Sequence, residues 1–150
     1  MKIEWQWCRL DELSPRQLYA VMAARSDVFV VEQNCVYRDL DGRDADALHL
    51  IGWSGDAVAA YTRVLAPGTA FAEPSIGRVL TTKAFRRGGL GRELFAKSVA
   101  HVQTLYPGQS IRIGAQSYLE GFYGSFGFVK ASEEYIEDGI AHIEMVKAAR

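Results

Sequence analysis

The chain has 150 residues and a formal net charge of −1 at pH 7, and 49% of its residues are hydrophobic. This length suits one domain with a single core, so we expect one domain over residues 1–150 and no disordered tract. The balanced charge argues against nucleic acid or an anionic membrane as a partner.

The first ten residues carry Lys2, Glu4 and Arg9 and lack the apolar core of a signal peptide. No apolar run approaches the roughly 18 residues of a membrane span. The two cysteines, Cys8 and Cys35, do not have C-x-x-C spacing and are expected to be free thiols in a reducing compartment. These features predict a cytoplasmic protein.

The first third of the chain predicts a strand followed by helix. Residues 3–7 alternate apolar and polar side chains, as a half-buried strand does. Ser14 and Pro15 suit the N-cap and the first position of a helix. A second helical segment is predicted to reach Glu32, although residues 28–31 also suit a strand.

Residues 34–47 are predicted to form a loop that contains four aspartates. The spacing does not match a calcium-binding loop, because Arg43 and Leu50 occupy the fifth and twelfth positions counted from Asp39. We therefore expect a solvated acidic segment that pairs with nearby arginines such as Arg25.

The centre of the chain predicts three strands, at residues 48–54, 57–65 and 76–82. The first two join at a short turn, Gly55-Asp56. Gly77 in the third strand indicates a bulge or a close backbone approach. A helical stripe of apolar residues then runs from Gly89 until Pro107.

The last third predicts a strand at residues 110–115 and a short helix at residues 118–126. A closing hairpin follows, formed by strands at residues 128–135 and 141–146. The resulting order of elements predicts an α/β sandwich with helices on both faces of the sheet. Exposed edge strands near the hairpin could pair with a second copy, so the protein is predicted to be either a monomer or a homodimer.

A glycine-rich stretch at residues 86–91, Arg-Arg-Gly-Gly-Leu-Gly, separates a predicted strand from a predicted helix. Glycines let backbone N–H groups converge and a bulky anion approach, because no Cβ intervenes. The helix start adds unpaired N–H groups and the positive end of the helix dipole. Arginines at positions 86, 87 and 92 crowd this end, which favours an anion as the missing component.

The stretch does not match two common phosphate-binding templates. A P-loop requires Gly-Lys-Ser/Thr, whereas Arg92 and Glu93 follow Gly91. A dinucleotide-binding fingerprint requires Gly-x-Gly-x-x-Gly, which this stretch lacks. The spacing of Arg86, Gly89 and Gly91 instead resembles the GNAT superfamily of acetyl-CoA-dependent N-acyltransferases.

This resemblance implies a mixed, mostly antiparallel sheet whose central strands splay, with the acyl group in the split and the coenzyme A pyrophosphate in the glycine loop. It also implies that the strand before the loop offers its backbone to the pantetheine arm. Acetyl-CoA is then the co-substrate, and no metal is expected. The predicted coenzyme contacts are Val79, Leu80, Thr81, Arg86, Arg87, Gly88, Gly89, Leu90, Gly91, Arg92, Gln116 and Tyr123.

Residues 119–128 resemble a second GNAT hallmark, a short helix that bears a tyrosine. Here that residue is Tyr123, and the resemblance implies that it lies beside the coenzyme sulfur and protonates the leaving thiolate. A phenol with a pKa of about 10 can donate this proton. The alternative is a packing role among the neighbouring aromatic residues. Gln116 stands where many family members have Asn.

An amine acceptor has to lose a proton before it attacks a thioester. A lysine-like amine is neutral in only about one molecule in 2,500 at pH 7, which adds roughly 4.6 kcal/mol to the barrier. We therefore expect a general base, with His142 and Glu32 as the leading candidates and His49 as a third. His101 is predicted to face solvent.

The resemblance extends over essentially the whole chain, and it is specific for the ElaA-type branch of the superfamily. It rests on Trp5 and on residues 28–35, 114–116 and 137–142. It implies direct attack of a small-molecule or protein amine on the thioester, with a covalent route through Cys35 as the alternative.

Two other functions are alternatives. A weaker likeness to acyl-homoserine-lactone synthases involves Arg25, Phe29 and the aspartates of the acidic loop. A protein that binds acyl-CoA as a sensor without catalysis is the second. Turnover with a panel of amines distinguishes a sensor from an enzyme.

Overall fold

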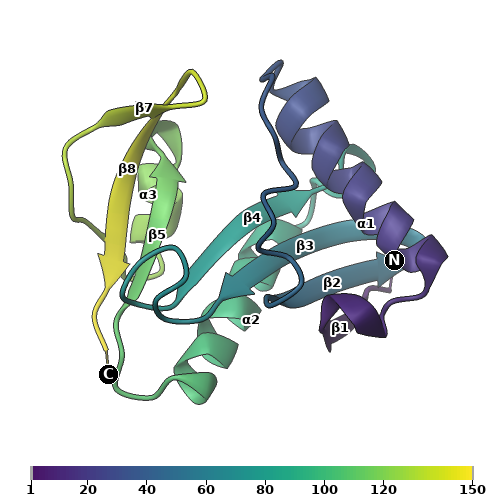
Figure 1. The fold of residues 1–150 in the computed structure, drawn as a ribbon, viewed down its shortest axis with the longest axis horizontal. Helices are drawn as coiled ribbons and strands as arrows, with labels where there is room; N and C mark the ends of the chain where they lie inside the picture. The colour runs from purple at the N-terminus through teal and green to yellow at the C-terminus, as the bar shows by residue number, and fades with distance from the viewer. Residues whose placement is uncertain (1, 150) are drawn as a thin grey trace.

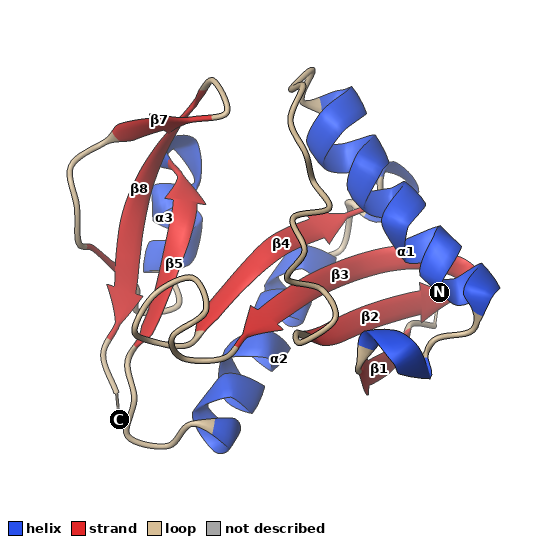
Figure 2. Cartoon of the chain, in the orientation of Figure 1, coloured by secondary structure: helices blue, strands red, loops and turns tan. Residues whose placement is uncertain are grey.

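The computed structural model describes residues 2–149, which form two antiparallel sheets that meet at one end of the neighbouring strands β4 and β5 (Figure 1). The first sheet has the strand order β1-β2-β3-β4, and in the second β8 pairs with β5, β6 and β7. Figure 2 shows both sheets in red. The strands are β1 (Glu4–Cys8), β2 (Leu48–Ser54), β3 (Ala57–Leu65), β4 (Ser75–Thr81), β5 (Ile111–Gln116), β6 (Val129–Lys130), β7 (Tyr135–Glu137) and β8 (Ile140–Lys147).

Helices cover both faces of the first sheet, with α1 on one face and α2 on the other (Figure 1). Adjacent residues of β2 explain this arrangement, because side chains alternate along a strand. Ile51 packs with Val21 of α1, whereas Leu50 packs with Leu94 of α2. The helical elements are η1 (Leu10–Glu12), α1 (Pro15–Ser26), η2 (Asp27–Glu32), η3 (Lys83–Phe85), α2 (Leu90–Leu105), η4 (Ser117–Leu119) and α3 (Glu120–Gly124).

The predicted start of α1 and the predicted second helical segment are both confirmed. Ser14 Oγ accepts a hydrogen bond from Gln17 N at 3.2 Å, and Gln17 Oε1 accepts one from Ser14 N at 3.0 Å. The second segment, η2, continues α1 directly and has π-helical geometry. Among residues 2–149, no helix has the length and apolar character needed to cross a membrane.

Strands β4 and β5 meet at one end only. The Arg112 N–H donates to the Pro74 carbonyl oxygen at 3.1 Å, at the start of both strands. Beyond this bond the described residues form no ladder between the two strands, and the strand ends at Thr81 and Gln116 diverge (Figure 1). The splayed central strands of the GNAT fold are therefore confirmed.

A bulge in β4 accompanies this divergence. Tyr61 of β3 pairs with Leu80. Arg63, two residues on, pairs with Gly77, so that two residues of β4 oppose one of β3. One of the two is Arg78, whose φ of +51° lies in the left-handed region. This backbone conformation destabilises a non-glycine residue by about 1–2 kcal/mol, which other contacts have to offset. The predicted irregularity at Gly77 is thus confirmed one residue further along.

A buried ion-pair network holds Arg78 in this conformation. Arg78 Nε lies 2.7 Å from Asp39, which also binds Arg25 Nε at 2.9 Å. Arg25 is 0% exposed and also binds Asp44, whose carboxylate lies 3.1 Å from Arg63. Such charges are tolerated inside a protein because they are paired. The predicted pairing of the acidic loop with Arg25 is confirmed, but Asp39 and Asp44 are buried, not solvated.

The predicted strand over residues 128–135 is wrong, because two short strands, β6 and β7, pair with β8 in its place. Val129 pairs with Val146 and Tyr135 pairs with His142. The chain advances six residues from Val129 to Tyr135, whereas the paired stretch of β8, from Val146 to His142, advances only four. The chain between β6 and β7 therefore loops out of the ladder.

Two other local predictions differ from the structure. The ring of His101 does not project into solvent but stacks on Trp7 of β1, with centroids 4.1 Å apart. The short helix predicted at residues 118–126 consists of a 3₁₀ turn, η4, followed by α3, which ends at Gly124.

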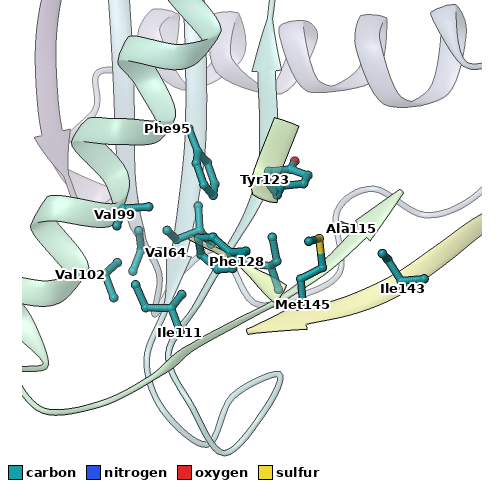
Figure 3. Close-up of a cluster of buried hydrophobic side chains, with 12 residues drawn as sticks. Val64, Phe95, Val99, Val102, Ile111, Ala115, Tyr123, Phe128, Ile143 and Met145 are labelled. Atoms are coloured by element: carbon teal, nitrogen blue, oxygen red, sulfur yellow. The ribbon is translucent and has the colours of Figure 1, made fainter. Parts of the chain in front are cut away.

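An aromatic cluster fixes the position of α3 (Figure 3). Phe95 of α2 contacts Tyr123 edge-to-face with ring centroids 5.0 Å apart, and contacts Phe126 at the same centroid distance. Edge-to-face contacts of this kind fix ring orientation as well as position. In Figure 3 the Tyr123 hydroxyl points away from the surrounding apolar side chains.

We predict that Asp44→Asn lowers the free energy of unfolding by about 3 kcal/mol, because it leaves buried guanidinium groups partly uncompensated. Although burial opposes it, hydrogen bonding and charge from Arg25 and Arg63 lower the pKa of Asp44 below its ordinary value of 3.8. The carboxylate therefore stabilises the fold above pH 3.8, and this contribution is lost as the pH falls below that value.

Urea denaturation at several pH values measures the effect. Asp56→Asn, in the exposed turn between β2 and β3, is the matched control and should change stability by less than about 0.5 kcal/mol. Equal stabilities of Asp44→Asn and the wild type at pH 7 would show that the network does not stabilise the fold.

Candidate active site

The divergence of β4 and β5 opens into a cavity of about 450 Å³. Residues 76–81 of β4 form one wall, and β5 forms another through Ile113, Gly114 and Gln116. The remaining walls come from the end of η2, from α3 and from the turn between β7 and β8. The cavity thus lies at the split where the family resemblance implied the acyl group.

The free edge of β4 faces this cavity. β4 is the last strand of its sheet, and it hydrogen-bonds to β3 on one side. Arg86 Nε donates to the Thr81 carbonyl oxygen at 3.0 Å. An unpaired strand edge can bind an extended, amide-containing molecule through its backbone groups. Val79, Leu80 and Thr81 all line the cavity, so the predicted backbone contacts lie at its wall.

The glycine turn has the backbone conformation that its residues permit. Gly88 and Gly89 have φ angles of +80° and +77°, and Gly89 is the N-cap of α2. The first helical bond runs from Glu93 N to the Gly89 oxygen at 3.1 Å, which leaves the preceding N–H groups as unpaired donors. A Cβ at Gly88 or Gly89 would meet nothing within 4 Å, so the space beside these donors is open. The turn fits a phosphate group.

The three arginines near this turn are directed differently. Arg87 is exposed and takes part in none of the ion pairs among residues 2–149. Arg92 packs over the Phe126 ring at 4.7 Å from its centroid and donates to Ser125 Oγ at 3.0 Å. Arg86 forms an ion pair with Glu32 at the cavity wall. Arg86 is therefore engaged at the cavity, away from the open side of the glycine turn.

Tyr123 brings a phenol into the cavity from α3. The residue is 7% exposed, and its hydroxyl hydrogen-bonds to none of residues 2–149. Burial, with a smaller contribution from Tyr118, raises the pKa of Tyr123 to about 12. The phenol is therefore protonated at neutral pH and free to donate.

His142 brings an imidazole into the same cavity from β8. Its Nδ1 lies 2.7 Å from the Ile140 carbonyl oxygen, and this contact requires a proton on Nδ1. Nε2 then carries the lone pair that a base needs. The ring stacks on Tyr135 with centroids 5.9 Å apart, and Nε2 lies 3.8 Å from Glu137 Oε2.

The other predicted site residues are divided between the cavity and the core. Glu32 and Gln116 line the cavity. His49 does not: it is fully buried, with Nδ1 2.6 Å from the Tyr61 hydroxyl and Nε2 2.9 Å from the Asp44 carbonyl oxygen. Burial lowers the pKa of His49, which is a structural residue of the ion-pair network.

Sequence reasoning gave no site role to several polar residues of the cavity wall, among them Tyr37, Arg78, Glu137 and Asp138. Glu137 and Asp138 belong to residues 137–142, one of the segments on which the family resemblance rests, and that resemblance and their proximity to His142 are the signals that point to them. Arg78 gave no signal, because its position depends on the bulge.

The comparisons with known proteins agree with this geometry. A sequence profile described as "Acetyltransferase (GNAT) domain" matches residues 10–149. Protein ElaA of Escherichia coli is 43% identical over 147 residues, covering 97% of this chain and 96% of ElaA. Its crystal structure superposes with a TM-score of 0.90 at 42% identity and covers 97% and 99% of the two chains.

A crystal structure of an acyl-CoA N-acyltransferase from Pseudomonas aeruginosa superposes with a TM-score of 0.92, at 36% identity and with coverage of 98% and 100%. A CoA-dependent acyl-homoserine lactone synthase superposes with a TM-score of 0.79 but is 14% identical, covering 99% of this chain and 84% of that one. The latter likeness shows the fold alone.

The chain belongs to the GNAT acyltransferase superfamily, as its splayed strands and its glycine-lined helix start indicate. Within that superfamily it is similar to ElaA, which confirms the branch that the sequence motifs indicated.

We predict that Gly89→Ala weakens coenzyme A binding at least tenfold, because its Cβ would project into the open space beside the N–H donors of α2. Isothermal titration calorimetry with coenzyme A measures the affinity.

Gly108→Ala is the matched control. Gly108 has a φ of +79° and similarly open surroundings, but it follows the far end of α2. Both substitutions therefore carry the same backbone strain, and Gly108→Ala should retain affinity. Equal losses in the two variants would indicate a general effect of strain and would count against a phosphate site at Gly89.

Proposed function

We propose that this protein transfers an acetyl group from acetyl-CoA to a primary amine by direct attack, with Tyr123 as the general acid. One observation carries the proposal. A phenol without a hydrogen-bond partner among residues 2–149 and an imidazole with a free Nε2 enter one cavity, whose wall is the open edge of β4.

Coenzyme A binding is assigned to the glycine turn and to the edge of β4. The open donors beside Gly88 and Gly89 support a pyrophosphate contact, and the exposed Arg87 supports it electrostatically. Backbone groups of Val79 and Leu80 are the proposed partners of the pantetheine arm. When bound, acetyl-CoA supplies an activated acyl carbon and a thiolate leaving group.

His142 is the proposed general base, because its Nε2 is available to accept a proton from the protonated amine. Removing that proton offsets the roughly 4.6 kcal/mol that a protonated amine adds to the barrier at pH 7. A new bond joins nitrogen to the acyl carbon as the carbon–sulfur bond breaks, and Tyr123 protonates the departing sulfur. The acylated nitrogen then loses its second proton, which restores the Tyr123 phenol, and the imidazolium loses its proton to solvent.

Glu32 is the second candidate base. Its ion pair with Arg86 occupies the carboxylate, which favours His142. The Cys35 thiol donates to the Asp138 carbonyl oxygen at 3.0 Å, and this bond favours a structural role over a covalent intermediate.

The wider setting is part of the proposal. A chain with a net charge of −1 and two free, buried cysteines suits a cytoplasmic enzyme without a nucleic-acid or membrane partner. We propose one catalytic domain over residues 1–150, active as a monomer or homodimer without a metal.

We predict that Tyr123→Phe lowers kcat about 100-fold while the KM for acetyl-CoA changes less than twofold, because only the proton donor is removed. Release of coenzyme A thiol in the presence of a panel of amines provides the rate. Tyr106→Phe, at the end of α2 and outside the cavity, should keep full activity.

The pH profile tests the same assignment. With a pKa of about 12, the Tyr123 phenol keeps its proton up to about pH 11, so the wild-type rate should not fall between pH 8 and pH 10. Coenzyme binding without any turnover would identify a sensor and refute the enzymatic proposal.

We predict that His142→Gln reduces kcat/KM about 100-fold at pH 7 and much less at pH 10, where more of the amine is already neutral. Initial rates for His142→Gln and Glu32→Gln across this range separate the two candidate bases. If Glu32→Gln recovers at high pH and His142→Gln is unaffected at pH 7, Glu32 is the base.

A further inference from the structure

The charges on the cavity wall are unequally compensated. Arg86 and Glu32 neutralise each other. Arg78 is neutralised from outside the cavity, because its Nε lies 2.7 Å from Asp39 and its Nη2 3.4 Å from Asp41. Both wall arginines therefore already have carboxylate partners.

Two carboxylates of the wall remain, and both belong to the turn between β7 and β8. Glu137, with a side chain 59% exposed, has one basic neighbour, His142 Nε2 at 3.8 Å, which carries a charge only when the imidazole is protonated. Asp138 forms no ion pair with any of residues 2–149. Asp138 nonetheless lines the cavity, together with Tyr37 and His142.

A hydrogen bond across the cavity fixes the turn that carries these carboxylates. The Cys35 thiol, on the segment that follows η2, donates to the Asp138 carbonyl oxygen at 3.0 Å. Asp138 and Gly139 have φ angles of +51° and +76°, as a tight two-residue turn requires. Figure 1 shows this turn opposite the segment that follows α1. The carboxylates are therefore held beside the proposed base.

We propose that the acceptor is a short amine with a second cationic centre, which Glu137 and Asp138 bind. This inference rests on the proposed function. Once His142 has taken its proton, the attacking nitrogen carries no charge. The imidazolium lies beside Glu137 only, so the two carboxylates together keep an excess negative charge. A second ammonium a few methylene groups away satisfies them and holds the free amine near Nε2. A carboxylate on the acceptor is repelled, so free amino acids are poor acceptors.

The test compares butane-1,4-diamine with butylamine as acceptors for the full chain and acetyl-CoA. These two molecules share the reacting amine and differ in the second charge. We expect the wild type to prefer the diamine at least tenfold in kcat/KM, chiefly through KM. The preference should shrink as NaCl rises from 0.05 M to 1 M, because salt screens exposed carboxylates.

Variants assign the preference to the turn. Asp138→Asn and Glu137→Gln should each raise the KM for the diamine about threefold to tenfold and leave the KM for butylamine within twofold. Glu134→Gln, an exposed carboxylate outside the cavity, is the matched control and should change neither value.

Equal use of the two amines by the wild type would overturn the inference and leave the proposed function intact. Equal KM increases for both amines in Asp138→Asn would also overturn it. If neither amine is acetylated, the proposed function fails for these acceptors. Calorimetry with butane-1,4-diamine and the coenzyme A complex then decides between two outcomes. Binding that is lost when Glu137→Gln and Asp138→Asn are combined supports the inference, and no binding to the wild type overturns it.

Discussion

The separation of β4 from β5 is the constraint on which the rest of the structure depends. Within residues 2–149 one backbone hydrogen bond, from Arg112 N to the Pro74 oxygen, joins the two sheets at the start of these strands. The bulge at Arg78 then alters the register of β4, and the buried aspartates hold Arg78 in its left-handed conformation. Without a bulge the two strands could continue pairing, and a closed ladder would fill the space that now forms the cavity. Burying these ion pairs of arginine and aspartate costs free energy. In return they hold the bulge, and the bulge keeps the edge of β4 open.

Helix α3 and strand β8 each bring a titratable side chain into the cavity, and each side chain is positioned by contacts outside it. The edge-to-face contact with Phe95 orients Tyr123, and burial keeps its phenol protonated. The Ile140 carbonyl oxygen selects the tautomer of His142 that leaves Nε2 free. A proton donor and a proton acceptor thus meet in one cavity because two packing arrangements converge there. Neither arrangement requires a ligand to form it.

The distribution of acidic residues shows why composition is a poor guide to the acceptor side of the cavity. The aspartates of residues 34–47 are the most conspicuous acidic cluster in the sequence, but three of them, Asp39, Asp41 and Asp44, form ion pairs with arginines. The carboxylates with few partners are Glu137 and Asp138, in a turn that looks ordinary in sequence. Charge that has already been compensated inside the protein cannot select a substrate, whereas uncompensated charge can.

The sequence by itself determined the α/β class, the start of α1 at the Ser14 cap, the glycine turn at the start of α2 and the short helix that carries Tyr123, because local rules of capping, periodicity and backbone freedom govern them. It also indicated the splay, through the family motifs and Gly77. Only the tertiary structure decided that His49 lies in the core and His142 in the cavity, that Arg86 pairs with Glu32, and that the closing strand breaks into β6 and β7. These features depend on register and on contacts between residues distant in the chain, which no local pattern encodes.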